Sequence, residues 1–262
     1  MMPLGIGARD VLALTRDAQH GDVVARPLLV TGVLAEQLAA ELAAGGDRAL
    51  VVTSGDPAQA AAVVRVVAGA ATPADEAHLR AATRALVPVV AVQTGISAVP
   101  LPYVLALDVI EVQPGKGFPT EQIAQALAAA LGHEGAPLAA RLPALRAAIE
   151  RRRAIDGALA AGALAALTRD GGPHLPALAI AQTRMLSELA VADGVPSPRD
   201  TRAAAESVAP GLAAAVVTGL VARTLVRRLP VRGRLVEGAV AALATAALAA
   251  LAGRIGSVRS GS

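Results

Sequence analysis

The segment EVQPGKGFPTEQIAQAL, Glu111 to Leu127, joins the end of an apolar run to a glycine-rich turn with one lysine and then to a helical pattern. Backbone N–H groups in such a turn, together with a lysine ammonium, can hold a phosphate or another small anion. Lys116 is the only lysine, and the only phenylalanine and tyrosine lie nearby. The candidate contact residues for a small ligand are therefore Gln93, Tyr103, Gly115, Lys116, Gly117 and Phe118.

Other reactive side chains show no catalytic or metal-binding spacing. The chain has no cysteine, and its four histidines are scattered at His20, His78, His133 and His174. No G-x-S-x-G motif is present, and no G-x-G-x-x-G follows a predicted strand. We therefore expect no catalytic residue, no metal site and no cofactor.

Short apolar runs alternate with helical patterns between residues 27 and 132, after a predicted amphipathic helix around Ala8 to Ala18. Asp56-Pro57 and Thr72-Pro73 are typical helix starts, and Asp75 completes a capping box. Another helix is predicted from Pro119 to Leu131. Continuous apolar runs separated by helices favour a parallel sheet covered on both faces. Five strands are predicted, at 27–31, 49–53, 63–68, 88–93 and 108–112.

The fold class is therefore α/β, with an N-terminal parallel sheet of Rossmann-like or P-loop-like three-layer architecture followed by an all-α domain. Ligands of such sheets bind at the carboxyl ends of the strands. From about Pro137 the strand signals stop, and helices are predicted at 142–167, with Gly157 and Gly162 as weak points, and at 177–194. We divide the chain into an N-terminal helix and lead-in (1–26), an α/β domain (27–132) and a helical domain (133–262) whose Ala/Gly-rich apolar hairpin spans 207–253.

The first half resembles the GTPase branch of the P-loop fold. AVVRVVAGAATPADEAHLRAATRALVPVVAVQTG is similar to that family's strand, helix and next strand before its guanine-reading N-K-x-D motif. VIEVQPGKGFPTEQIAQAL is similar to its last strand, glycine-containing loop and final helix. The resemblance covers roughly residues 27–132, and it implies that the loop around Lys116 lies where such folds contact the base rather than the phosphates.

The residues that would bind and hydrolyse GTP are replaced. A Walker A loop needs G-x-x-x-x-G-K-[ST] after the first strand, whereas here the sequence is GVLAEQLA. Only Gly32 remains, and Glu36 places a carboxylate where phosphate would lie. The N-K-x-D motif would fall on Gln93, Thr94, Gly95 and Ile96, and isoleucine cannot accept hydrogen bonds from a base. The sequence thus predicts a degenerate GTPase-like domain that does not hydrolyse GTP or ATP.

The second half resembles the YcjF-like family, bacterial helical domains of unknown function that accompany GTPase-like domains. LAIAQTRMLSELAVADG is similar to that family's L-x-x-N-Q-L-R-x-x-x-x-x-A-x-x-x-G helix: Gln182, Arg184 and Gly194 keep the pattern, and Ala181 replaces its asparagine. The glycine-rich apolar pair at 207–253 also matches. The resemblance implies association with a membrane.

The apolar hairpin leaves three alternatives open: a close-packed soluble hairpin, an interfacial or re-entrant hairpin, and a pair of spanning helices. Its uncharged runs are shorter than the roughly 20 residues of a spanning helix. Small residues recur every fourth position, at Gly211, Ala215 and Gly219 and at Gly238, Ala242, Ala246 and Ala250, which favours close helix packing. The connecting segment offers candidate contacts to anionic lipid headgroups. These are Arg223, Arg227, Arg228, Arg232 and Arg234.

Charge and composition bear on location and partners. The N-terminus carries charges and lacks the apolar core of a signal peptide, so we expect a cytoplasmic protein at the inner face of the cell membrane. The net charge is +3, and no aromatic residues lie among the arginines to stack on bases, so we expect no nucleic-acid partner. The remaining expected partners are an anionic membrane surface, a second copy of the chain or a GTPase-like protein.

Two functional hypotheses follow from the sequence. The first is a non-catalytic adaptor in which a degenerate GTPase-like domain is joined to a membrane-associating or oligomerising helical domain. The second is an α/β protein that binds a small anion or a nucleotide with the loops between residues 93 and 119, where Lys116 would hold the anion and Phe118 or Tyr103 would cover it.

Overall fold

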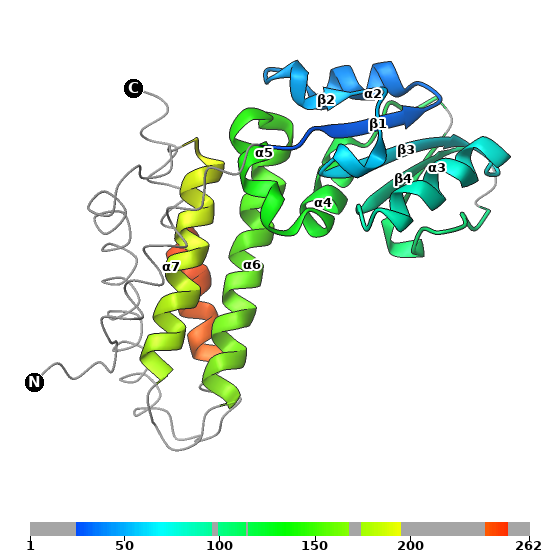
Figure 1. Cartoon of the computed structure of the whole chain (residues 1–262). Helices are drawn as coiled ribbons and strands as arrows, with labels where there is room; N and C mark the ends of the chain where they lie inside the picture. Colours follow the sequence, from blue (N-terminus) through cyan, green and yellow to red (C-terminus); the bar gives the residue numbers. More distant parts are fainter. Residues whose placement is uncertain (1–24, 96–98, 114, 168–173, 195–238, 251–262) are drawn as a thin grey trace, which may run out of the picture. The chain divides into compact units, whose positions relative to one another are not determined.

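The computed structural model describes residues 25–95, 99–113, 115–167, 174–194 and 239–250 (Figure 1). The predicted helix at 8–18, most of the apolar hairpin and its five arginines lie outside these residues. The chain divides into two compact units, Val23–Ile149 and the remainder, Met1–Asp22 with Glu150–Ser262. We describe each unit by itself.

The first unit contains a sheet of five parallel strands in the order β2-β1-β3-β4-β5. The strands occupy the five predicted positions, although β2 is short. Their bounds are β1 (Leu28–Gly32), β2 (Val51–Val52), β3 (Ala62–Ala68), β4 (Val89–Thr94) and β5 (Val109–Val112). The prediction of an α/β fold with a parallel sheet is thus confirmed.

Consecutive residues of the central strands are buried, so both faces of the sheet are covered. Helix α3 (Pro73–Arg84) packs on one face, where its Ala82 joins Leu29 of β1 and Val63 of β3 in one apolar cluster. Because side chains alternate along a strand, the neighbours of Leu29 and Val63 in these strands face the other side of the sheet. Helices α2 (Ala35–Leu42) and α4 (Thr120–Ala130) contact β1 and β4, respectively.

The connection between β2 and β3 differs from the prediction of a helix after Asp56-Pro57. Asp56 does act as a cap, because its carboxylate accepts a hydrogen bond from the N–H of Ala58 at 3.0 Å. The structure it caps is a single 3-10 turn at Pro57–Gln59, and the chain then enters β3 at Ala62. With so few residues between the two strands, a full helix has no room.

Residues 133–149, assigned from the sequence to the helical domain, lie in the α/β unit. Helix α5 (Gly135–Arg141) is joined to the loop after α2, because the N–H of Asp47 donates to the carbonyl of Arg141 at 2.9 Å and the two side chains form an ion pair. A second ion pair joins Arg26 to Glu134. Helix α6 (Pro143–Leu167) begins in this unit.

The second unit contains the rest of α6, α7 (His174–Ala192) and a helix at residues 239–250. Helix α6 runs without a break through Gly157, predicted to be a weak point. A Cβ at this position would lie 2.3 Å from the sulfur of Met185, so glycine allows α7 to approach. Met185, Leu189 and Ala249 form the apolar cluster described in this unit.

The helix at 239–250 packs through a different face from the one predicted. Its buried residues are Ala241, Thr245 and Ala249, whereas Ala246 and Ala250 of the predicted small-residue stripe are exposed. Buried positions still recur every fourth residue, but one place earlier in the chain. Thr245 decides the register, because its hydroxyl accepts a hydrogen bond from the amide of the buried Gln182 at 2.8 Å.

Candidate functional site

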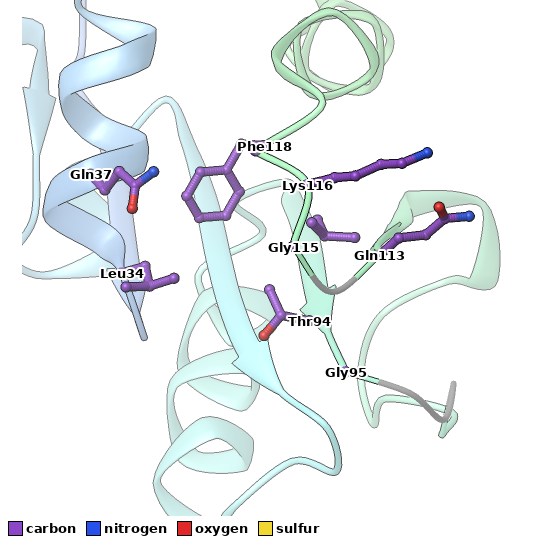
Figure 2. Close-up of a pocket in the computed structure, with 10 residues that line it drawn as sticks. Leu34, Gln37, Thr94, Gly95, Gln113, Gly115, Lys116 and Phe118 are labelled. Atoms are coloured by element: carbon purple, nitrogen blue, oxygen red, sulfur yellow. The ribbon is translucent and has the colours of Figure 1, made fainter.

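A pocket of about 370 Å³ opens at the carboxyl ends of the strands in the α/β unit (Figure 2). It falls within the volume range of small-molecule sites, about 300–1,000 Å³. Three segments build it: the start of α2, the end of β4, and the loop from β5 to α4. Its lining residues are Leu34, Gln37, Thr94, Gly95, Val112, Gln113, Gly115, Lys116, Gly117 and Phe118.

The floor of the pocket is set by strand register. Thr94 and Val112 are paired residues at the ends of β4 and β5, so their side chains share one face of the sheet. Thr94 pairs with Ala68 of β3, and Val63 of the same strand packs on the α3 side of the sheet. Because side chains alternate along β3, Ala68 and its partner Thr94 lie on the face opposite α3. A polar hydroxyl and an apolar side chain therefore lie side by side beneath the opening.

One wall is formed by the first turn of α2. Leu34 precedes the helix in the left-handed region at φ 55°, and 59% of the residue is exposed. This conformation costs a non-glycine residue about 1–2 kcal/mol. The amide of Gln37 donates to Glu41 Oε1 at 3.1 Å, which leaves its own carbonyl oxygen as a possible acceptor. Leu34 is thus both strained and exposed at the pocket edge.

The opposite wall is the loop after β5. A turn closed by the N–H of Lys116 donating to the carbonyl of Gln113 at 3.1 Å positions the glycines. Figure 2 shows the Phe118 ring directed toward Gln37 and α2, whereas the Lys116 side chain extends away from them. Phe118 is half-buried. The pocket therefore has an aromatic wall, and its ammonium group lies at the rim.

Four of the six sequence candidates, Gly115, Lys116, Gly117 and Phe118, line this pocket, whereas Gln93 and Tyr103 do not. Gln93 is next to Thr94 and so faces α3, where its buried amide donates to the carbonyls of Gly69 at 2.6 Å and Val99 at 3.1 Å. It holds two loops together.

Tyr103 lies with α3. Its hydroxyl accepts a hydrogen bond from Arg80 Nε at 3.1 Å, and the guanidinium carbon is 5.4 Å from the ring centre. The flanking residues Leu101 and Val104 pack against Val67 and Ala91 on the same face. Tyr103 therefore cannot cover a ligand held by Lys116 in this arrangement.

The connection from β1 to α2 lies flat against the sheet. Only Val33 and Leu34 separate the strand from the helix, and the N–H of Val33 donates to the carbonyl of Val66 in β3 at 3.2 Å. Gly32 has φ 102°, and a Cβ there would lie 1.9 Å from the same carbonyl oxygen. A phosphate-wrapping loop needs several residues raised from the sheet between strand and helix. Here Gly32 serves a close backbone contact.

Glu36, beside this connection, forms a hydrogen bond with a residue of another segment. Its carboxylate accepts a hydrogen bond from the Thr53 hydroxyl, just beyond β2, at 2.7 Å. It also lies in the first turn of α2, where a carboxylate complements the positive end of the helix dipole. Glu121 occupies the same place in α4. The two helices that begin at the pocket therefore each carry an acidic residue in their first turn.

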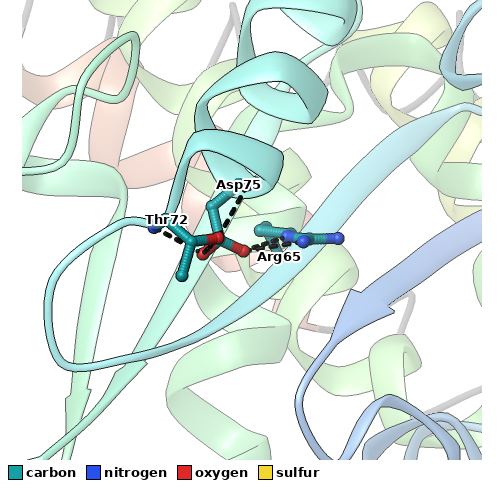
Figure 3. A network of polar contacts seen from close by, with 3 residues as sticks. All are labelled: Arg65, Thr72 and Asp75. Atoms are coloured by element: carbon teal, nitrogen blue, oxygen red, sulfur yellow. Dashed lines mark hydrogen bonds and ion pairs between the residues drawn. The ribbon is translucent and has the colours of Figure 1, made fainter.

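A buried polar cluster lies on the α3 face, away from the pocket (Figure 3). Arg65 of β3 donates from Nε and Nη2 to Asp75 Oδ1 at 2.9 and 2.6 Å. The other oxygen, Oδ2, accepts from the N–H and hydroxyl of Thr72 at 2.8 and 2.6 Å. The predicted capping box is thus confirmed, and Arg65 is its additional buried partner.

The charge state of Asp75 follows from this environment. Burial raises the pKa of its carboxyl, but the hydrogen bonds from Thr72 and Arg65 and the charge of Arg65 outweigh burial and lower the pKa below its ordinary value of 3.8. With both carboxylate oxygens occupied by neighbours in the fold, the cluster has a structural role.

Among the described residues, no group of three or more His, Asp or Glu could hold a metal ion. Within the same ranges, no helix has both the length and the apolarity needed to cross a membrane. Comparison of the chain with protein-family models, with curated proteins and with solved structures found no match.

Proposed function

We propose that this chain is a non-catalytic binding protein whose α/β unit holds a small ligand at the carboxyl ends of β4 and β5. The observation that carries the proposal is the pocket itself, which combines an aromatic wall, an exposed strained leucine and a few polar groups. Ligand sites in open α/β sheets lie at this edge. Among the residues that line the pocket, the only hydroxyl is that of Thr94 and none carries a carboxylate or an imidazole to act as its base, so binding rather than turnover is the activity we propose.

We also propose that the α/β unit is a degenerate GTPase-like domain of the P-loop fold. The strand order and the place of the β5–α4 loop support a degenerate GTPase-like domain, and the two-residue β1–α2 connection supports the loss of triphosphate binding. In this interpretation the β5–α4 loop, which would contact a base, is retained. The β1–α2 connection, which would hold phosphates, lies against β3 instead.

A thermal-shift screen tests the proposed function. Neutral metabolites, nucleotides and small anions are added separately to the full chain, to Phe118→Ala and to Lys116→Ala. A ligand present at about 100 times its Kd stabilises the folded protein by about 2.7 kcal/mol, so binding raises Tm. We expect stabilisation of the full chain that Phe118→Ala abolishes. If no compound raises Tm, the proposed function is wrong.

A second candidate function concerns the helical unit, as the membrane-associating or oligomerising part of an adaptor. Ile155 and Leu159, one turn apart on α6, are 47% and 64% exposed, and Leu243 is 71% exposed. Exposed apolar side chains at helical spacing favour contact with a partner or a membrane surface. Cell fractionation of the full chain and of a chain ending at residue 199 tests this: the full chain should sediment with membranes or form oligomers, and an entirely soluble monomer would contradict it.

A further inference from the structure

The charges around the pocket favour an uncharged ligand. Among the pocket-lining residues Lys116 carries the only charge, and its side chain extends away from Gln37 and Leu34 (Figure 2). The positive ends of α2 and α4 are already complemented by Glu36 and Glu121. Glu36 is hydrogen-bonded to Thr53 and Glu121 to Gln125, so neither carboxylate lines the pocket, but each lies in the first turn of its helix and disfavours a phosphate bound at that helix start.

The walls favour a flat, apolar-faced ligand. Leu34 at the start of α2 and Phe118 in the β5–α4 loop line the pocket from two different segments, and the apolar Val112 lines it from the end of β5. The side chain of Leu34 is 59% exposed, and a ligand that covers it would remove this apolar surface from water. An aromatic ring is the group that Phe118 recognises best, through offset stacking.

The polar groups favour an amide-like edge. The Thr94 hydroxyl can donate and accept, and the side chain of Gln37 offers an amide donor and acceptor, whereas the Gln113 side chain extends away from Gln37 as that of Lys116 does (Figure 2). The hydroxyl of Thr94 is only loosely held, at 3.4 Å from the carbonyl of Val67. These groups match a ring edge that carries neighbouring C=O and N–H groups.

We propose that the pocket takes an uncharged planar heteroaromatic compound with an amide-like edge, such as a nucleoside or a nicotinamide, inserted between Leu34 and Phe118, and that it rejects the phosphorylated form. This inference rests on the proposed ligand-binding function and narrows it. Leu34 is the residue that determines specificity for a flat apolar face.

Two leucines with the same backbone conformation provide a matched pair of variants. Leu34 and Leu86 both have φ 55°, but Leu86 follows α3, is 91% exposed and lies outside the pocket. Asparagine tolerates this conformation better than leucine. Leu34→Asn and Leu86→Asn should therefore keep or raise the stability of the chain to similar extents, whereas only Leu34→Asn removes the apolar wall.

The experiment measures binding of adenosine, guanosine, nicotinamide, the two 5′-monophosphates and inorganic phosphate by calorimetry with the full chain. We expect at least one of the three uncharged compounds to bind, its affinity to fall about ten- to hundredfold in Leu34→Asn, and Leu86→Asn to bind as the parent does. The monophosphates should bind about tenfold more weakly or worse, with an affinity that rises when salt screens the repulsion.

Other results overturn the inference. If a monophosphate or phosphate binds more tightly than the uncharged compounds and Lys116→Ala abolishes that binding, the ligand is an anion; the proposed function then stands and this inference fails. Equal loss of binding in Leu34→Asn and Leu86→Asn would show that Leu34 has no specific role. If none of these compounds binds while the wider screen finds another ligand, the inference alone is wrong; if nothing binds in either experiment, both proposals are wrong.

Discussion

Gly32 shows how one backbone position holds the β1–α2 connection against β3. A Cβ there would overlap the carbonyl oxygen of Val66, and the backbone is also left-handed. Gly32→Ala should therefore lower the free energy of unfolding by more than about 3 kcal/mol, since a backbone clash adds to conformational strain. Gly69 has φ 69° with open space around its Cβ position.

Gly69→Ala is accordingly the control, and it should cost only about 1 kcal/mol. Urea unfolding followed by far-UV circular dichroism measures both, because the chain has no tryptophan to report by fluorescence. Equal costs for the two substitutions would contradict the close approach of Gly32 to β3.

The lowered pKa of Asp75 predicts that part of the free energy of unfolding is lost at acidic pH. Because its folded pKa is lowered, its contribution is fully present above the ordinary carboxyl pKa and is lost as pH falls through the folded pKa. Asp75→Asn leaves the buried Arg65 without its counter-charge and should cost about 3–5 kcal/mol near neutral pH.

The stability gap between the parent chain and Asp75→Asn should narrow as the pH is lowered below about 4. Chemical unfolding at several pH values measures it. A gap of the same size at neutral and acidic pH would show that the ion pair and the hydrogen bonds from Thr72 to the carboxylate are not what stabilises this cluster.

At the residue scale, contacts between residues that are close in the sequence could be predicted. Thr72 and Asp75 are three positions apart, so their capping box could be predicted from spacing alone. The partnership of Asp75 with Arg65 crosses from helix to strand, and Arg65 inside the run VVRVVA was its only signal. Gln93 and Thr94 are neighbours that face opposite sides of the sheet, and no local pattern decides which one reaches the pocket.

Helix α6 depends on a glycine for its contact with α7. In an exposed helix interior, replacing glycine by alanine stabilises by about 1 kcal/mol. At Gly157 the new methyl group would meet Met185, with contacts reaching as far as its Cβ at 3.2 Å. Overpacking costs about 1–3 kcal/mol, so Gly157→Ala should be net neutral to destabilising.

A double-mutant cycle with Met185→Ala separates the two effects. In the Met185→Ala chain the contacts with Sδ at 2.3 Å and Cγ at 2.9 Å are gone and only the contact with Cβ at 3.2 Å remains, so Gly157→Ala should cost less than in the parent chain or become stabilising. Urea unfolding of all four chains provides the coupling energy. If Gly157→Ala stabilises the parent chain and the Met185→Ala chain equally, α7 does not approach α6 at this position.

Element types were predicted well, and element faces less well. The five apolar runs became the five strands because continuous burial leaves a distinctive pattern. The segment after Asp56 became a 3-10 turn because the distance to β3 is short, although its cap and proline resemble a helix start. In the helix at 239–250 nearly every residue is small, so composition could not tell the buried stripe from its neighbour; the pairing of Gln182 with Thr245 distinguishes them.

At the scale of the whole molecule, the α/β unit extends to Ile149 because ion pairs and a backbone hydrogen bond attach residues 133–149 to it. No strand signal marks these residues, so the sequence placed them with the helices that follow. The pocket lies entirely within this unit, and its segments are separated by up to 84 positions, from Leu34 to Phe118. Leu34 and Gln37 could not be predicted as pocket residues, because only the strand order brings α2 beside the β5–α4 loop.

Backbone amide chemical-shift mapping of the full chain with the compound that raises Tm most shows directly whether a ligand binds in the pocket. Binding in the pocket should shift the amides of residues 34–37, 94–95, 112–113 and 115–118, with no change around Arg65 and Asp75 on the opposite face of the sheet. Shifts confined to the α3 face or to the helical unit, or shifts that persist unchanged in Phe118→Ala, would contradict it.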